Sequence, residues 1–216
     1  LLLGHSGNTF NNDPIHMNQI SVAPISGPYW DKGDLLISSR HLSTVFLYRP
    51  STDKIIWHQS GPWMNQHSAR FVDNQKISIF DNNVFGGAPH SAPFLEKDGI
   101  NRIFIYDFSK KEASEPYKAL LEQTKPITIS EGLVRVLDDG GLFLEESNYG
   151  RHLRFTKDKL LWSRVNDYDD KRIGLLSWSR YLTQEEARTP LEAIAGKLSA
   201  NPSCSKASLQ QSESPH

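Results

Sequence analysis

The feature that most constrains the fold is a set of short strands that occurs twice with the same plan. The two stretches are GDLLISSRHLSTVFLYRPSTDKIIWHQ (33–59) and GGLFLEESNYGRHLRFTKDKLLWSRV (140–165). Each contains an apolar strand, a polar corner, a second strand, an Asp-Lys turn, two aliphatic residues and a tryptophan, Trp57 or Trp162. Short apolar runs between Gly, Asp and Asn turns are typical of β-strands, so the two stretches predict two copies of one β-unit.

A further strand precedes each copy, at residues 16–24 and 131–139, which makes four strands in each unit. A middle unit begins at His67 and carries a long insertion between residues 83 and 101. Units of about 40–60 residues that repeat in this way are typical of a β-propeller, in which each unit is one blade. A β-sandwich of similar strands is the alternative. We prefer the propeller, because the third and fourth strands repeat with the same turn and tryptophan.

The sequence therefore predicts an all-β chain in three parts. Residues 1–182 form a partial β-propeller domain of about three blades, residues 183–198 a short helical segment, and residues 199–216 a polar, disordered tail. Closed propellers have about four to eight blades. We therefore expect part of a larger ring whose missing blades are N-terminal, with a homodimer of half-rings as the alternative.

Composition and motifs exclude several classes of function. The net charge of −1 gives no electrostatic footprint for nucleic acid, and no apolar run approaches the length of a membrane span. The single cysteine, Cys204, allows neither an internal disulfide nor a cysteine-based metal site. No P-loop, dinucleotide fingerprint or nucleophile elbow is present, so no cofactor is predicted. His16, His67, His90 and Asp81 lack a diagnostic metal spacing, and no metal is predicted.

Polar residues interrupt the expected strands at the entry of the first strand. His16 and Asn18 are two residues apart, which places them on one face if both lie in a strand. A histidine and a carboxamide on one face form a convergent donor and acceptor pair. The alternative is that both residues cap a turn after Pro14.

Two further interruptions follow along the chain. Arg40 and His41 stand in the run LISSRHLST, and an arginine fork matches the oxygens of sulfate, phosphate or carboxylate. His67 starts the next unit at the place that His16 holds in the first, so the two should lie close together. A neutral imidazole is a competent nucleophile or base near neutral pH. The alternatives are a surface arginine at a hairpin corner and a hydrogen-bonded turn histidine.

The order of these motifs resembles the bacterial arylsulfotransferases, the aryl-sulfate sulfotransferases that do not use PAPS. That family carries an H-x-N strand, an S-S-R-H strand, a Q-H motif and an F-D-N strand in succession. The resemblance covers about residues 13–182 and rests on His16-Met17-Asn18, Ser38-Ser39-Arg40-His41, Gln66-His67 and Phe80-Asp81-Asn82.

The resemblance implies a six-bladed propeller with its active site at the central channel, in the periplasm or outside the cell. It implies that His67 is transiently sulfated, that His16, Asn18 and Arg40 hold and neutralise the sulfuryl oxygens, and that His41 contacts the substrate. The small-molecule partners would be an aryl sulfate donor and a phenol acceptor, without metal or nucleotide. The family uses a further histidine from an earlier blade, for which His5 lies too close to the start. The run PISGPYW (24–30) is longer than in the family and is expected beside the channel.

Three other functions remain open at this stage. The chain could be a propeller module that binds a ligand without turning it over. It could be a related hydrolase or lyase-type enzyme that uses the same residues on another anionic ester. A half-propeller could also be inactive by itself.

Overall fold

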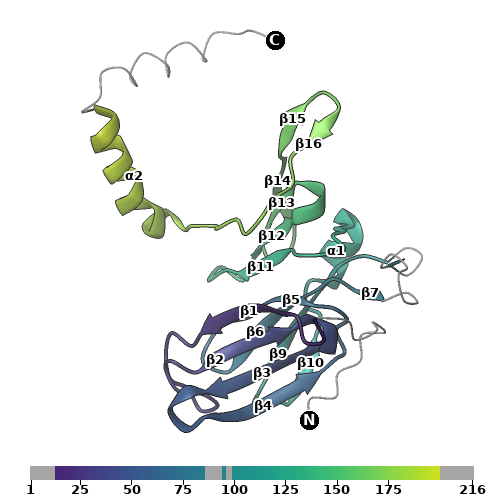
Figure 1. Ribbon diagram of the computed structural model, residues 1–216. Helices are drawn as coiled ribbons and strands as arrows, with labels where there is room; N and C mark the ends of the chain where they lie inside the picture. Colours follow the sequence, from purple (N-terminus) through teal and green to yellow (C-terminus); the bar gives the residue numbers. More distant parts are fainter. Residues whose placement is uncertain (1–12, 86–93, 96–98, 200–216) are drawn as a thin grey trace. The chain divides into compact units, whose positions relative to one another are not determined.

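The fold is described from a computed structural model that covers residues 13–85, 94–95 and 99–199. The chain divides into two compact units, Leu1–Ser179 and Arg180–His216. The predicted disordered tail lies outside the described residues, apart from Ser199. The first unit holds all the strands and all the predicted site residues (Figure 1).

The first sheet is an antiparallel meander with the order β1-β2-β3-β4. Its bounds match the predicted strands closely, because alternating apolar residues fix both the strand and its register. The sheet contains β1 (Met17–Val22), β2 (Leu35–Ser39), β3 (Thr44–Arg49) and β4 (Lys54–Ser60).

The second sheet repeats the meander, with the order β5-β6-β9-β10. Its strands are β5 (His67–Phe71), β6 (Lys76–Asp81), β9 (Arg102–Asp107) and the short β10 (Glu112–Ser114). The insertion between β6 and β9 contains a small hairpin of β7 (Val84–Phe85) and β8 (Phe94–Leu95). A short helix, α1 (Lys118–Thr124), follows the second sheet.

The third sheet has the order β11-β12-β13-β14. It contains β11 (Leu133–Val136), β12 (Leu142–Glu146), β13 (Arg151–Phe155) and β14 (Leu160–Val165), followed by a hairpin of β15 (Asp167–Asp169) and β16 (Arg172–Ile173). The prediction of an all-β chain built from three four-stranded units is thereby confirmed. The described residues do not form a closed ring of sheets.

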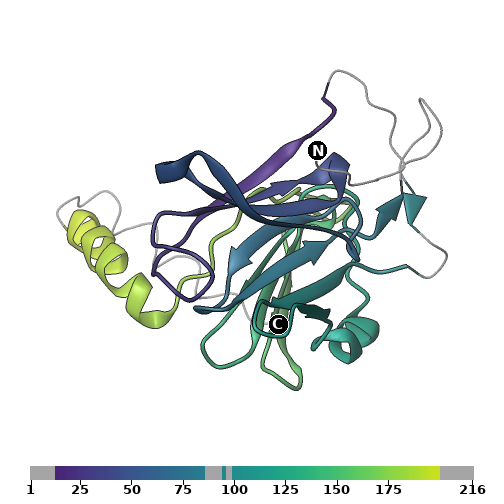
Figure 2. The same cartoon turned by 90° about the horizontal axis from the view of Figure 1, so that it is seen from below.

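The second sheet lies between the other two (Figure 2). Ile77 and Ile79 of β6 pack toward the first sheet, with Leu36 and Val45. Phe80 lies in a second buried cluster with residues of the third sheet, such as Val134. Burying apolar side chains on both faces of one sheet removes them from water, at about 25 cal/mol per Å², and this fixes the order of the three sheets.

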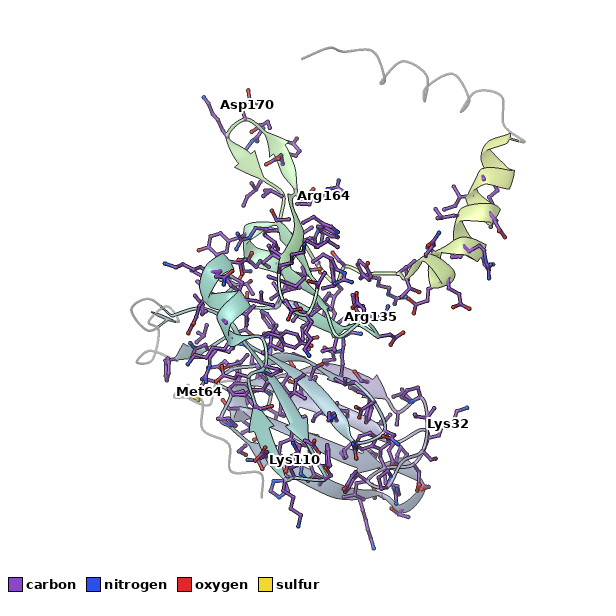
Figure 3. All side chains as sticks on the ribbon, turned by 180° about the vertical axis from the view of Figure 1, so that it is seen from behind. Lys32, Met64, Lys110, Arg135, Arg164 and Asp170 are labelled. Carbon is purple, nitrogen blue, oxygen red and sulfur yellow. The ribbon has the colours of Figure 1, made fainter. Side chains whose placement is uncertain are left out.

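The loop between β1 and β2 lies away from the predicted site. In the β1–β2 pair, Met17 lies opposite Ser39 at one end, and Val22 opposite Leu35 at the other. The loop joins this second end, and its Trp30 is buried at 1% exposure. Figure 3 shows Lys32 of this loop and Met64, which precedes β5, at opposite ends of the sheets. The expectation that the run 24–30 lies beside the active site is therefore wrong.

The second unit contains one described helix, α2 (Gln184–Ser199). The helix confirms the helical segment predicted at residues 183–198. Thr183 and Glu186 form a capping box, in which the Glu186 N–H donates to the Thr183 hydroxyl and the Thr183 N–H to the Glu186 carboxylate. The helix continues through Pro190, where the sequence pattern is interrupted. Among the described residues, neither helix is long and apolar enough to cross a membrane.

Candidate active site

The site lies where β1 begins and β2 ends. The Arg40 N–H donates to the His16 carbonyl at 2.9 Å, and the His41 N–H donates to the Ile15 carbonyl at 3.3 Å. Arg40 opens a short 3-10 turn, Arg40–Leu42, that closes on Ser43 in a left-handed conformation. The main chain thus holds His16, Arg40 and His41 at one end of the first sheet.

Gln66 fastens the start of β5 to this end of the first sheet. Its side-chain amide donates to Ser38 Oγ at 3.0 Å and to the carbonyls of Ser39 and Thr44, both at 3.1 Å. Asn18 Nδ2 donates to the Gln66 carbonyl at 2.8 Å. Gln66 is fully buried, so His67, the next residue, is held close to the residues of the first sheet.

His67 is buried, with 4% of its surface exposed, and both of its ring nitrogens have partners. Its Nδ1 lies 2.6 Å from Asn82 Oδ1. The Glu131 N–H donates to its Nε2 at 3.2 Å. Glu131 has a φ of +60° and Gly132 of +89°, and a Cβ on Gly132 would lie 2.4 Å from the Phe80 ring. This turn beside His67 therefore requires a glycine.

The electrostatics around His67 favour a neutral imidazole. Burial, with smaller contributions from the positive charges of Arg40 and His16, lowers the pKa of His67 to about 4 against the opposing hydrogen bond to Asn82. Burial also lowers the pKa of the Arg40 guanidinium, and its buried Nε has no hydrogen-bond partner. No carboxylate pairs with Arg40 in the described part of the chain, so its half-buried charge acts on His67 without a compensating negative charge.

His16 lies in a cluster that the strand argument does not explain. β1 begins only at Met17, and His16 has a φ of +49°. The expectation that His16 and Asn18 share one strand face is therefore wrong. Instead, His16 Nδ1 lies 2.5 Å from the Asp13 carboxylate, whose pKa this hydrogen bond lowers. The His16 ring stacks on His41, with centroids 4.5 Å apart.

Asp81 supports the loops that lead to and from the site. Its Oδ1 accepts hydrogen bonds from the N–H groups of Met64 and Asn83, both at 2.8 Å. Burial raises the pKa of Asp81 to about 7. Below that pH the carboxyl group is largely neutral, which suits its fully buried position.

These two buried groups should have opposite effects on the pH dependence of stability. Between pH about 4 and 6.5 only the unfolded chain protonates His67, so this residue makes the free energy of unfolding rise with pH. Between pH 3.8 and about 7 Asp81 is protonated only in the folded chain, so this residue makes the free energy of unfolding fall as the pH rises.

Single substitutions should separate the two effects. The two pH ranges overlap between pH about 4 and 6.5. In that range, relative to wild type, His67→Asn should lose about 1.4 kcal/mol of stability for each unit of rising pH, and Asp81→Asn should gain as much. Urea denaturation at several pH values measures both differences. A difference from wild type that stays constant with pH would contradict the assignment for that residue.

The residues that could hold a metal ion form a hydrogen-bonded cluster. Ligand atoms of Asp13, His16 and His41 lie within 4.8 Å of one another. However, Asp13 already binds Nδ1 of both imidazoles. Its carboxylate binds His16 Nδ1, and its main-chain carbonyl lies 2.7 Å from His41 Nδ1. His90, another candidate ligand, lies outside the described residues.

The structure brings together the predicted residues and adds partners that the sequence argument missed. His16, Asn18, Arg40, His41 and His67 all lie at the joined ends of β1, β2 and β5. The added groups are Asp13, Asn82 and the Glu131 N–H. One sequence signal could have found Asn82. It directly follows the second strand of its sheet, as Arg40 does in the first.

Comparison with known proteins identifies the family of the chain. The model of the arylsulfotransferase (ASST) family matches residues 2–167, which is most of the chain. That range contains every residue of the site described above. No curated protein matches the chain. The chain belongs to the arylsulfotransferase family.

Proposed function

We propose that this protein transfers a sulfuryl group from an aryl sulfate to a phenol through a sulfohistidine at His67. The observation that carries the proposal is the buried, neutral imidazole of His67 beside Arg40, whose Nε has no hydrogen-bond partner among the described residues. A neutral imidazole has the lone pair that a nucleophile needs. The half-buried Arg40 has a charge that an anion would neutralise and a fork that fits sulfuryl oxygens.

In the first half-reaction, the Nε2 lone pair of His67 forms a bond to sulfur as the bond from sulfur to the aryl oxygen breaks. The electron pair of the broken bond leaves with the phenoxide. Arg40 would stabilise the negative charge that spreads over the sulfuryl oxygens. The side-chain amide of Asn18 would contribute its second N–H, because its first N–H donates to the Gln66 carbonyl. The Glu131 N–H, which now donates to Nε2, can donate to a sulfuryl oxygen instead.

Protons balance if His16 serves both halves of the reaction. Protonated His16 gives its proton to the departing phenoxide and becomes neutral. In the second half, neutral His16 takes the proton of the acceptor phenol, whose oxygen attacks sulfur while the bond from nitrogen to sulfur breaks. Asp13, bound to Nδ1 of His16, fixes the orientation of the ring and leaves Nε2 for the proton transfer. The scheme returns both histidines to their starting state.

We also propose that the three sheets are blades of a propeller. Trp57 on β4 packs against Tyr106 and Phe108, with centroids 5.0 and 4.7 Å apart, on the next sheet along the chain. Trp162 holds the same place in the third sheet, beside Phe143, and is 38% exposed. A further sheet packed on this face would repeat the contact and place His67 near the centre of a ring.

The test is a transfer assay on the full natural protein with a chromogenic aryl sulfate and a phenol acceptor. The proposal expects release of phenol, formation of a new aryl sulfate, and initial-rate kinetics in which the donor's product leaves before the acceptor reacts. Alkyl sulfates and phosphate esters complete the donor panel. Ligand binding without transfer would favour a binding module. Reaction of phosphate esters alone would favour a related hydrolase or lyase-type enzyme that acts on another anionic ester.

The role of His16 predicts a dependence on the leaving group. In His16→Gln, transfer from phenyl sulfate should fall by roughly 10²-fold or more, because its phenoxide needs a proton. Transfer from a nitrophenyl sulfate should fall much less, since nitrophenoxide leaves without one. The donor's kcat/KM, plotted against the phenol pKa of a donor series, measures this, because it reports only the first half-reaction and excludes the role of His16 in the second.

His41→Gln is the matched control, because His41 stacks on His16 and shares Asp13 with it. This variant should change the rates of all donors by a similar factor. An equal loss for every donor in His16→Gln would rule out proton donation by His16.

A further inference from the structure

We infer that Asn82 is a positioning residue that holds His67 in the tautomer with its proton on Nδ1, so that the lone pair lies on Nε2. This inference rests on the proposed role of His67 as the nucleophile and deepens it. It concerns a residue that would not itself touch the transferred group.

The orientation of the Asn82 amide follows from its partners. Its Nδ2 donates to the carbonyls of Thr128, at 3.0 Å, and Glu131, at 2.9 Å. A carbonyl can only accept, so the NH₂ group must face these two oxygens and Oδ1 must face His67. An amide oxygen is also only an acceptor. The 2.6 Å contact with His67 Nδ1 therefore requires a proton on Nδ1.

The other ring nitrogen supports the same assignment. The Glu131 N–H donates to Nε2, and only an unprotonated nitrogen can accept it. Glu131 thus contributes its carbonyl to Asn82 and its N–H to His67, which closes a loop of hydrogen bonds around the imidazole. Asn82 and the Glu131 N–H specify the same tautomer, and that tautomer has its nucleophilic nitrogen away from Asn82.

Buried contacts hold Asn82 itself in place. The Asn101 side chain donates to the carbonyls of Asn82, at 2.9 Å, and Thr128, at 3.0 Å, and accepts from the Thr128 N–H at 2.6 Å. Asn82, Asn101 and Thr128 are all fully buried. Because water cannot replace these partners, reorienting the amide would leave several buried polar groups unpaired.

Two substitutions of Asn82 have opposite expected results. Asn82→Leu keeps the approximate volume but removes the acceptor, so His67 should no longer favour Nδ1–H. The kcat for transfer should fall by roughly 10²- to 10⁴-fold with little change in KM, the scale seen when a catalytic histidine has the wrong tautomer. Asn82→Asp keeps an acceptor at Nδ1 and should retain the tautomer, while its negative charge raises the pKa of His67 and moves the acidic limb of the pH profile upward.

The experiment combines nitrogen NMR of isotope-labelled histidines with kinetics, on the full natural protein. His67→Asn assigns the His67 signals by their loss. Wild type and Asn82→Asp should show a protonated Nδ1 and an unprotonated Nε2, and Asn82→Leu should show a mixture. Asn101→Leu is the matched control, since it removes a buried amide that binds Asn82 only at its main-chain carbonyl, and leaves both acceptors of the Asn82 amide in place. It should lower stability and keep the tautomer.

Each outcome bears on one claim. A wild-type His67 with its proton on Nε2 would overturn the inference, and so would an unchanged tautomer or kcat in Asn82→Leu. A loss of kcat in Asn101→Leu as large as in Asn82→Leu, with equal loss of stability, would reduce Asn82 to a structural residue. Full transfer by His67→Asn would instead refute the proposed nucleophile, whereas the NMR result would still report the tautomer.

Discussion

Replacing His67 by asparagine should abolish sulfuryl transfer and leave the fold in place. The asparagine amide can occupy the position of Nδ1 and still donate to Asn82 Oδ1, so the buried contact at 2.6 Å can survive. It has no atom in the position of Nε2, which is the proposed nucleophile. Loss of a covalent nucleophile costs on the order of 10³-fold or more in kcat.

Kinetics on a chromogenic donor, with denaturation measured alongside, check this prediction. Because the pKa of His67 is about 4, protonation of the nucleophile should limit the wild-type rate only near that pH. Substantial transfer by His67→Asn would contradict the account. A loss of activity that merely follows a loss of folded protein would make His67 a structural bridge between the second and third sheets.

Replacing Arg40 by methionine should separate catalysis from stability. No carboxylate pairs with the half-buried Arg40 among the described residues, so its proposed task is to bind the sulfuryl oxygens. Its removal should lower kcat by roughly 10²- to 10³-fold, the usual effect of losing one donor to a developing negative charge. Arg40→Lys should recover only part of the rate, because the charge returns without the planar fork.

Stability should respond in the opposite direction. Methionine keeps an apolar stem and removes a half-buried, unpaired charge, so the free energy of unfolding should rise or stay unchanged. The pKa of His67 should also rise, since the Arg40 charge lowers it. Kinetics and urea denaturation of the same samples measure these effects.

Arg49→Met is the matched control in the same sheet. Arg49 makes a forked contact with the buried Asp34, at 2.7–3.1 Å, at the other end of β3. Its removal should destabilise the protein by leaving Asp34 unpaired, and should leave transfer unchanged. Equal loss of kcat in Arg40→Met and Arg49→Met would contradict a specific role for Arg40.

Much of the fold could be predicted from the sequence, because strand signals in this chain are local. Short apolar runs between turn residues mark the limits of β2, β3 and β6. The short β10 carries no such pattern in its three residues, Glu112–Ser114, and forms by pairing with β9. Edge pairing of this kind is decided by tertiary contacts rather than by propensity.

The sequence predicted which residues lie together but not their geometry. The five residues His16, Asn18, Arg40, His41 and His67 come from two strands, β1 and β5, and from the segments just before β1 and just after β2. The prediction that His16 shares a strand face with Asn18 was wrong because His16 itself has a left-handed conformation, so that β1 begins only at Met17. The loop from 24 to 30 was misplaced because the sequence does not show that the Trp30 side chain fills the core at the far end of the sheet.

The most direct test of the central claim is to trap the covalent intermediate. The full natural protein is mixed with an aryl sulfate in the absence of acceptor, quenched under alkaline conditions and digested, and the peptides are analysed by mass spectrometry. The account predicts a sulfuryl group on His67 that disappears when phenol is added before the quench and never forms in His67→Asn. A sulfuryl group on another residue, or rapid transfer with His67 unmodified throughout, would contradict it.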